Sequence, residues 1–354
     1  MDNLFDLFNL FPPSFEDQLE AAEDGDAAAM QWVSQQYLKG DGEVDLDLEK
    51  SAYWMKQSAE NGFPESAFLM GIFYIKGIGV EKNRNKACEY MNLAKELGDS
   101  DAQRYLDLFA SLDEDETKAE NGDTQALCRL AEFYTSNGNM YPGDDGYEIA
   151  FKYAKKAAEL EDPEGIWCLA LAYEHGRGVE ENVDKAIKLF THAADLGHAK
   201  SMHNIGAIYL NEKDDVDKAL YWFKKSAENG HNVACCALGS LYEFGEYVDC
   251  DYEEAKKWYL MGAERGDAEA QYGLAMIYTG SDDSPTDLDA VVYWLEKSMA
   301  GGYEKAKMQY LLWSFLKSKK DKGELPNDVD DLIGWTIEAA ENGDEEAQKA
   351  LGMQ

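Results

Sequence analysis

A ten-residue phrase recurs along this chain, and each copy ends in a glycine and one further residue. Trp222–His231 reads WFKKSAENGH, and WMKQSAENGF and WYLMGAERGD begin at Trp54 and Trp258. The glycines that serve as anchors are Gly25, Gly62, Gly98, Gly122, Gly197, Gly230, Gly266, Gly302 and Gly343, with Glu161 in the vacant place. Most anchors lie 33 to 41 residues apart, a period typical of solenoids built from helix pairs.

Each anchor is followed by a pattern that predicts an α-helix, named helix A here. A small residue stands four positions after the anchor, an apolar residue at eight and, in most units, a tyrosine at twelve, as in Ala270 and Tyr278. Residues four apart lie on one side of an α-helix, so these positions form a buried face. The small residue would let a neighbouring helix approach closely.

Each anchor is also preceded by a pattern that predicts a second helix, named helix B. Asp or Asn stands fifteen residues before most anchors and would cap the first turn, and the anchor glycine would end the helix. The predicted caps are Asp47, Asn83, Asn182, Asp215, Asp251, Asp287 and Asp328. Bulky residues eight before the anchor are predicted to be buried knobs: Trp54, Tyr90, Tyr153, Leu189, Trp222, Trp258, Trp294 and Trp335.

The sequence therefore predicts an all-α, α/α solenoid of about nine helix pairs plus a truncated C-terminal unit, spanning residues 16–354. Residues 1–15 begin MDNLFDLFNLF and are predicted to cap the first repeat, the alternative being a peptide that docks on another protein. In the third unit Glu114 stands where an aromatic residue belongs. This irregularity predicts a break or change of pitch near residues 107–122.

Charge and cysteine content narrow the class of protein. Lys and Arg number 33 and Asp and Glu 70, a net charge of −37, which disfavours binding to nucleic acids and anionic membranes. It favours a basic partner, or serves solubility alone. No apolar run is long enough to span a bilayer, and no secretory signal is evident. The six cysteines show no regular spacing, which is typical of reduced thiols and predicts a cytoplasmic location.

Three stretches resemble SEL-one-like repeats, which are relatives of tetratricopeptide repeats. AEAQYGLAMIYTG begins at Ala268, GRGVEENVDKAIKLF at Gly176 and WYLMGAERGD at Trp258. The resemblance covers roughly residues 16–354. It implies right-handed superhelical stacking with the A helices lining a concave face. It also implies function through protein–protein contacts, and it supplies no family-wide catalytic residue.

No cluster of residues predicts catalysis, a cofactor or a metal. His192, His198 and His203 lie close together, but their spacing matches no metal-ligand pattern. Cys235 and Cys236 are adjacent in a predicted helix, where a disulfide between them would be strained, and they are interpreted as buried apolar side chains. The protein is therefore predicted not to be an enzyme.

In the resembling repeats, positions six and thirteen after the anchor point into the groove, and these positions vary between the units of this chain. The candidate partner-binding residues are Phe68, Trp167, His203 and Tyr272 at six, Glu174 and Glu243 at thirteen, and Glu132 nearby. Large aromatic residues dominate binding energy when desolvated, so Trp167 and Tyr272 are the expected anchors, beside an acidic wall. The alternative for each position is packing between repeats.

The function expected from these observations is a non-enzymatic scaffold for protein–protein interaction. Its partner would be a protein or peptide, basic in character, held in the concave groove. The alternative is an immunity or inhibitor protein that neutralises a basic toxin or enzyme, because complementary charge speeds such an association.

Overall fold

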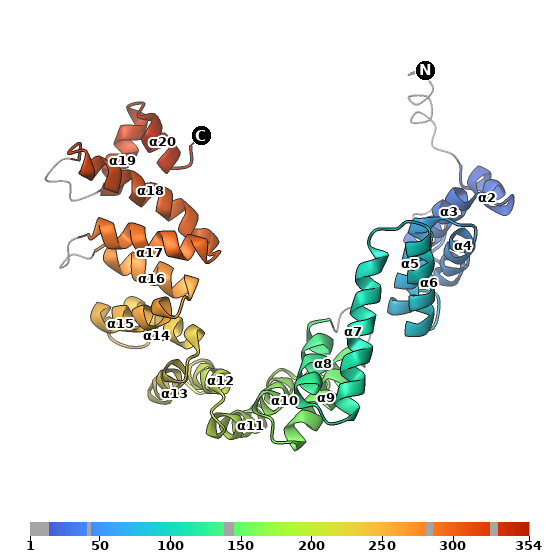
Figure 1. The fold of residues 1–354 in the computed structure, drawn as a ribbon, viewed down its shortest axis with the longest axis horizontal. Coiled ribbons are helices and arrows are strands. Elements are labelled where there is room, and N and C mark those ends of the chain that lie inside the picture. The colour runs from blue at the N-terminus through green and yellow to red at the C-terminus, as the bar shows by residue number, and fades with distance from the viewer. Residues whose placement is uncertain (1–13, 41–43, 138–144, 281–285, 326–331, 354) are drawn as a thin grey trace. The chain divides into compact units, whose positions relative to one another are not determined.

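The computed structural model describes residues 14–40, 44–137, 145–280, 286–325 and 332–353. Within these ranges the chain forms 19 α-helices, labelled α2 to α20, and no strand (Figure 1). No helix in the described ranges is both long and apolar enough to cross a bilayer. The chain divides into two compact units, Met1–Ala186 and Ile187–Gln354. Residues 1–13 of the predicted capping segment 1–15 and the predicted N-cap Asp328 lie outside the described residues.

The first unit is a series of consecutive helices that pack on their neighbours in sequence. Its helices are α2 (Phe15–Glu23), α3 (Ala27–Lys39), α4 (Leu48–Glu60), α5 (Pro64–Lys76), α6 (Arg84–Glu96), α7 (Ala102–Glu120), α8 (Thr124–Ser136), α9 (Asp145–Glu159) and α10 (Pro163–His175). The boundary between the units falls within α11 (Val183–Asp195). The all-α fold of sequential antiparallel helix pairs is therefore confirmed in this unit.

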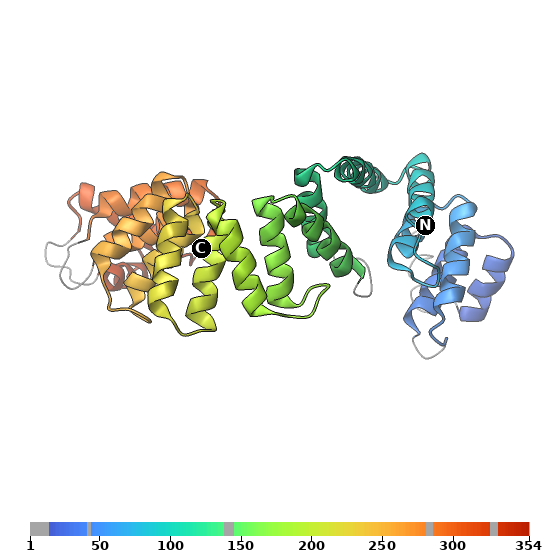
Figure 2. The same ribbon diagram turned by 90° about the horizontal axis from the view of Figure 1, so that it is seen from below.

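The second unit repeats the same construction, and Figure 2 shows its stacked helices from below. Its helices are α12 (Ala199–Asn211), α13 (Val216–Glu228), α14 (Asn232–Phe244), α15 (Tyr252–Glu264), α16 (Ala268–Tyr278), α17 (Leu288–Ala300), α18 (Glu304–Asp321), α19 (Leu332–Glu341) and α20 (Glu345–Ala350). The last helix, α20, packs against α18 and α19. Lys319 of α18 forms an ion pair with Asp344, the N-cap of α20, with its Nζ 3.0 Å from Oδ2.

The predicted helix boundaries are confirmed by their hydrogen bonds. Asp47, for example, accepts the backbone N–H of Lys50 at 2.9 Å, and its own N–H donates to the carbonyl of Tyr37 at 2.9 Å. The same arrangement recurs at Asn83, Asn182, Asp215, Asp251 and Asp287. The small residues four after each anchor are all buried. Cap and small residue together thus fix where each helix begins and which face it buries.

The knob positions were assigned one residue out of register. Of the eight, all within the described ranges, Trp258 alone is buried, and the other seven are only half-buried. The buried large side chain stands one position later in most repeats, as Phe190, Phe223 and Tyr259 do. The reason is helical geometry. Ala227, three residues before the anchor Gly230, is buried. It lies four residues after Phe223, on the same side of the helix, but five residues after the predicted knob Trp222.

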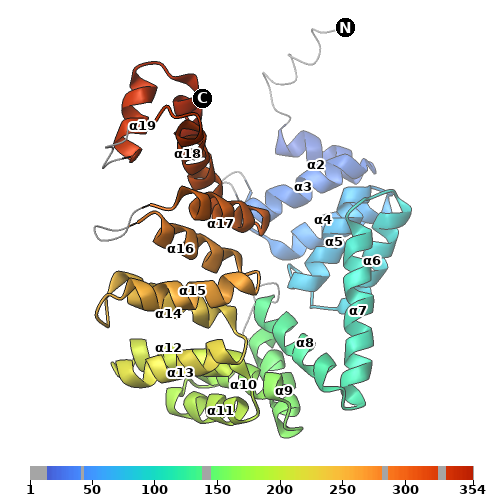
Figure 3. The same cartoon turned by 60° about the vertical axis from the view of Figure 1, so that its left-hand side comes forward.

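The third unit has one continuous helix where a pair was predicted. Figure 3 shows α7 as a single long helix between α6 and α8. No proline or glycine stands between Ala102 and Glu120, and the helix runs unbroken for these 19 residues. One continuous helix thus occupies the stretch near residues 107–122, and the break or change of pitch predicted there stays a prediction.

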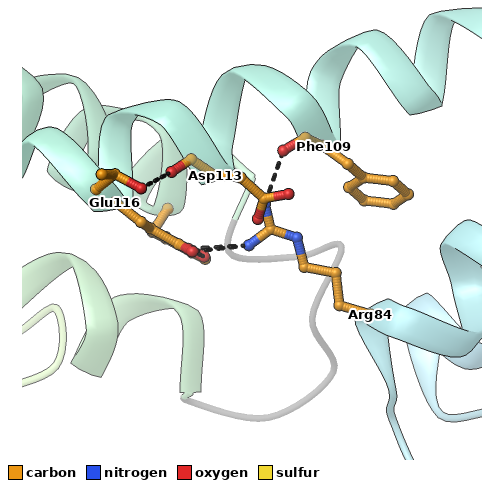
Figure 4. A network of polar contacts seen from close by, with 6 residues as sticks. Arg84, Phe109, Asp113 and Glu116 are labelled. Atoms are coloured by element: carbon orange, nitrogen blue, oxygen red, sulfur yellow. Dashed lines mark hydrogen bonds and ion pairs between the residues drawn. The ribbon is translucent and has the colours of Figure 1, made fainter.

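A network around Arg84, the first residue of α6, holds this long helix (Figure 4). Its Nη1 donates to Glu116 Oε1 at 3.0 Å and to Oε2 at 3.1 Å. Its Nη2 donates to the carbonyl of Phe109 at 2.9 Å and lies 2.8 Å from Asp113 Oδ1. One guanidinium thus binds three successive points along α7.

All nine anchor glycines have positive φ, between 84° and 101°. Glu161, which fills the vacant anchor place, also has positive φ, at 56°. A Cβ added at any of these nine glycines meets no atom within 4 Å. The requirement for glycine is therefore one of backbone conformation, and Glu161 carries the strain of a side chain in the left-handed region.

Glu161→Gly is expected to raise the free energy of unfolding by about 1 kcal/mol, because glycine adopts this conformation without steric cost. The measurement is urea denaturation followed by circular dichroism. Glu159→Gly, within the last turn of α9, is the matched control and should lower stability by about 1 kcal/mol. Loss of stability in both variants would contradict the strain at Glu161.

Candidate partner-binding site

A pocket in the first unit lies between the A helices α8 and α10, with α9 behind them. Its volume is about 190 Å³. It contains two of the candidate residues, Glu132 and Trp167, together with Thr135 and Phe151. Alanine, leucine and aromatic side chains form most of its wall, and Arg177 stands beside it. The structure therefore brings an aromatic candidate and an acidic candidate to one hollow.

A second pocket, in the second unit, lies between the A helices α14, α16 and α18. Its volume is about 310 Å³. Two more candidates, Glu243 and Tyr272, line it. The ring of Tyr303, the residue before α18, lies 5.1 Å from that of Tyr272, centroid to centroid. Phe244 is 72% exposed at its edge. This pocket has the same kind of place in the repeat as the first.

Tyr259, on the B helix α15, reaches the second pocket by passing between two glycines. A Cβ added at Gly239 of α14 or at Gly273 of α16 would lie 2.5 Å from the Tyr259 ring. The hydroxyl donates to Glu243 Oε2 at 2.7 Å and lies 3.0 Å from Ser240 Oγ. The glycines thus allow a buried ring from the layer behind to place its hydroxyl among the groove residues.

Burial determines the acidity of these two groups. Desolvation raises the pKa of Glu243, and the hydrogen bond from Tyr259 opposes that rise. Desolvation also raises the pKa of Tyr259 well above its usual range. The tyrosine therefore remains a neutral donor, and the carboxylate is held in surroundings that disfavour its charge.

The other candidates lie outside both pockets. Phe68 packs on Tyr105, with 5.5 Å between ring centroids. The side chain of Glu174 is 12% exposed, and its Oε2 lies 3.8 Å from Nε2 of His175. His203 is half-buried, and its ring centroid lies 5.2 Å from those of Phe223 and His231. His203 Nδ1 is buried with no hydrogen-bond partner.

Acid is expected to destabilise the second unit through His203. Burial, with a smaller contribution from His231, lowers the pKa of His203 to about 4. Burial also lowers the pKa of His231, as do Lys200 and His198, whereas Asp267 raises it. In the unfolded chain His203 takes up a proton below about pH 6.5, and the folded chain does not. Stability is therefore lost as the pH falls from 6.5 towards 4, reaching a loss of roughly 2 kcal/mol from His203 at pH 5.

The measurement is the free energy of unfolding at pH 7.5 and pH 5 for the wild type and His203→Phe. Subtracting one difference from the other removes the titration of the many carboxylates that both proteins share. An equal pH dependence in the two would show that His203 titrates normally in the folded state.

Two cysteines at offset six and one tyrosine make polar contacts that the sequence did not predict. Cys128 and Cys236 occupy offset six but are buried, and their thiols donate to the N-cap residues Asp162 and Asp267 of the next A helix, at 3.6 and 3.3 Å. The residue after the anchor is an aspartate in several repeats, and its side chain accepts backbone N–H groups at the start of helix A, as Asp162 and Asp267 do. Tyr259 was also missed. A signal for it existed, because a tyrosine stands where other repeats carry apolar side chains.

All six cysteines are free thiols in the structure, and Cys235 and Cys236 are both buried, as expected. In the part of the chain that the structure describes, no group of three or more His, Cys, Asp or Glu side chains is placed to hold a metal ion. The side chains that line the two pockets offer aromatic, carboxylate and hydroxyl contacts to a ligand.

Comparison with known proteins identifies the repeat. The Sel1 repeat matches seven stretches, residues 27–63, 64–99, 124–162, 165–198, 199–231, 232–267 and 268–303. Chitin synthase regulatory factor 3 of Schizosaccharomyces pombe is 27% identical over 323 residues, which cover 87% of this chain and 31% of the relative. This chain thus spans about a third of the length of that curated relative.

Two solved structures are similar in sequence and fold. A Sel1 repeat protein from Oxalobacter formigenes is 26% identical, with 83% of this chain and 89% of that chain covered and a TM-score of 0.48. A protective antigen of uropathogenic Escherichia coli that displays an SLR fold is 26% identical, with 96% and 82% covered and a TM-score of 0.46. The matched repeats take up well over half of the sequence, and the chain belongs to the Sel1 repeat family.

Proposed function

We propose that this protein is a non-enzymatic scaffold that binds another protein or peptide along the A-helix face of its repeats. The observation that carries the proposal is the pair of pockets, each of which lies between consecutive A helices. Each combines an aromatic residue with a carboxylate, Trp167 with Glu132 and Tyr272 with Glu243. Large aromatics in concave places are the usual centres of binding energy.

The net charge of −37 supports a partner with a basic surface, since complementary charge steers encounter and raises the association rate. The similarity to a chitin synthase regulatory factor, a protein named for regulation, supports action on another protein. We further propose a cytoplasmic location, which six free thiols favour.

Site-specific photo-crosslinking in the native cell tests the binding face. A photoreactive phenylalanine replaces Glu132 or Phe244 beside the pockets, or Tyr53 or Tyr221 on the B helices α4 and α13. Tyr53 and Tyr221 are 56% and 58% exposed. We expect protein adducts from the first two positions. Adducts from Tyr53 and Tyr221 alone would place binding on the other face. A captured enzyme or toxin that loses activity in the complex would narrow the function to inhibition.

Trp167→Ala and Tyr272→Ala are each expected to weaken the partner's binding by about 2 kcal/mol, close to thirtyfold in Kd. Both side chains are half-buried pocket walls, so each change should lower the free energy of unfolding by about 1–2 kcal/mol and leave the fold intact. The measurement is titration calorimetry with the captured partner, with Tyr221→Ala as the matched control. Deletion of residues 1–13 tests the alternative site. Lost binding after that deletion, with both pocket variants unaffected, would contradict the proposal.

A further inference from the structure

We propose that the second pocket, between α14, α16 and α18, binds the guanidinium group of an arginine side chain on the partner. This inference rests on the proposed function and specifies the chemistry of one of its sites. Three features of the pocket lead to it: its aromatic rings, its carboxylates and the fixed polar network at its floor.

The aromatic rings offer faces to a cation. Tyr272 and Tyr303 are both half-buried, and their rings are tilted by 46° with centroids 5.1 Å apart. Phe244 adds a third ring at the edge, 72% exposed. Cations are attracted to the negative faces of such rings, and a planar guanidinium can also stack on them.

Two carboxylates, Glu243 and Glu269, line the same pocket, against the single cation of Lys305. Lys305 and Glu269 are exposed, whereas Glu243 is half-buried. A bound cation would compensate the half-buried carboxylate for its lost hydration. Burial raises the pKa of Glu243, and a cation bound there would oppose that rise by favouring the ionised form.

The polar network fixes the orientation of that carboxylate. Tyr259, only 4% exposed, donates to Glu243 Oε2 at 2.7 Å and lies 3.0 Å from Ser240 Oγ. The equivalent position is apolar in α13, where it is Phe223, and in α17, where it is Leu295. Placing a phenol in the core is costly unless its hydroxyl is bonded. Here the hydroxyl holds Glu243 in place, which suits a site that must present a carboxylate in one direction.

The first pocket shows why the inference is confined to the second. Its wall is formed largely by apolar side chains, including Phe151 and Trp167, and its single carboxylate, Glu132, shares the pocket with the cation of Arg177. Such a wall suits an apolar side chain. In the second pocket the rings and carboxylates together suit a planar cation, and an arginine binds a carboxylate through a fork that a lysine lacks.

The test titrates the full chain with Nα-acetyl-arginine N-methylamide, followed by ligand-observed NMR and calorimetry. The citrulline derivative, which has nearly the same shape without the charge, and the lysine derivative are the comparison ligands. We expect the arginine derivative to bind at least tenfold more tightly than the citrulline derivative and severalfold more tightly than the lysine derivative. Equal affinity for arginine and citrulline would overturn the proposal.

Variants locate the binding. Glu243→Gln and Tyr272→Ala should each weaken it at least tenfold, and Phe244→Ala, at an exposed side chain, severalfold. Glu264→Gln removes the same charge at an exposed position of α15 outside the pocket and should leave the affinity unchanged. Equal weakening by Glu264→Gln and Glu243→Gln would show attraction to the whole acidic chain and overturn the site. If Glu243→Gln fails to fold, Phe244→Ala and Tyr272→Ala decide the question.

The two proposals can fail separately. Partner adducts at Phe244 without any preference for the arginine derivative would remove the arginine site and leave the scaffold function. Binding of the arginine derivative at this pocket, with partner adducts only on the B helices, would remove the proposed binding face and leave the arginine site.

Discussion

Phe223→Ala is expected to lower the free energy of unfolding by about 4 kcal/mol, the cost of emptying a large buried side chain from a packed core. Phe223 is 3% exposed. A Cβ added at Gly206 would lie 2.8 Å from its ring, so the ring packs directly on the backbone of α12. No small movement of a flexible side chain can fill the space that alanine would leave.

Trp222→Ala, at the adjacent position, is expected to cost only about 1–2 kcal/mol, because this side chain is half-buried and its lost burial is smaller. Its ring stacks edge-on with the exposed Tyr221 at 5.3 Å, and Lys225 Nζ lies 4.9 Å from its centroid. Trp258, which is 4% exposed, should instead behave like Phe223 and cost about 3–5 kcal/mol.

Urea denaturation of the three variants measures these differences, with tryptophan fluorescence of the wild type and Phe223→Ala as a second signal. The order expected is a large effect at Phe223 and Trp258 and a small one at Trp222. A larger loss of stability in Trp222→Ala than in Phe223→Ala would instead support the sequence prediction, in which the residue eight before the anchor forms the core.

This register shows how far sequence alone reaches in a repeat protein. Period, caps and small residues were predicted correctly where the structure describes them because each is a local rule that most copies repeat, as at Asp47 and Ala270. The predicted knob position is wrong because Trp222 and Phe223 are neighbours and both are large, so size alone does not show which of them is buried. Which of two adjacent residues faces inward depends on the alanine four positions further on, a relation that composition does not reveal.

The offsets from the anchor select Trp167, Tyr272 and Glu243, because the offset follows from the helix period, and these residues line pockets together with Glu132. Their role in binding a partner stays a prediction. The partner of Glu243 could not be predicted that way. Tyr259 comes from the other helix layer, and it reaches the pocket only because glycines stand on both flanking helices. Contacts between layers are set by packing in three dimensions.

Arg84→Ala is expected to lower the free energy of unfolding of the first unit by about 3 kcal/mol, since it removes the guanidinium donor from the partly buried Glu116 carboxylate and from the Phe109 carbonyl. The side chain is 27% exposed, and Glu116 is 32% exposed. In Figure 4 the guanidinium of Arg84 lies against α7 between Phe109 and Glu116. It supplies the tie between α6 and the long helix at the place where the regular pair is missing.

Arg84→Lys is the informative comparison, because lysine keeps the charge but cannot bond Glu116 through two oxygens and reach the Phe109 carbonyl at once. Arg84→Lys should therefore lower the free energy of unfolding by about half as much as Arg84→Ala does. Arg129 also forms an ion pair with α7, through Asp115, but its side chain is 49% exposed. Arg129→Ala should therefore lower the free energy of unfolding by less than about 1 kcal/mol. A double-mutant cycle of Arg84→Ala with Glu116→Gln should give a coupling above about 1 kcal/mol. A coupling near zero would mean that the network follows from the packing of α6 on α7 and does not hold it.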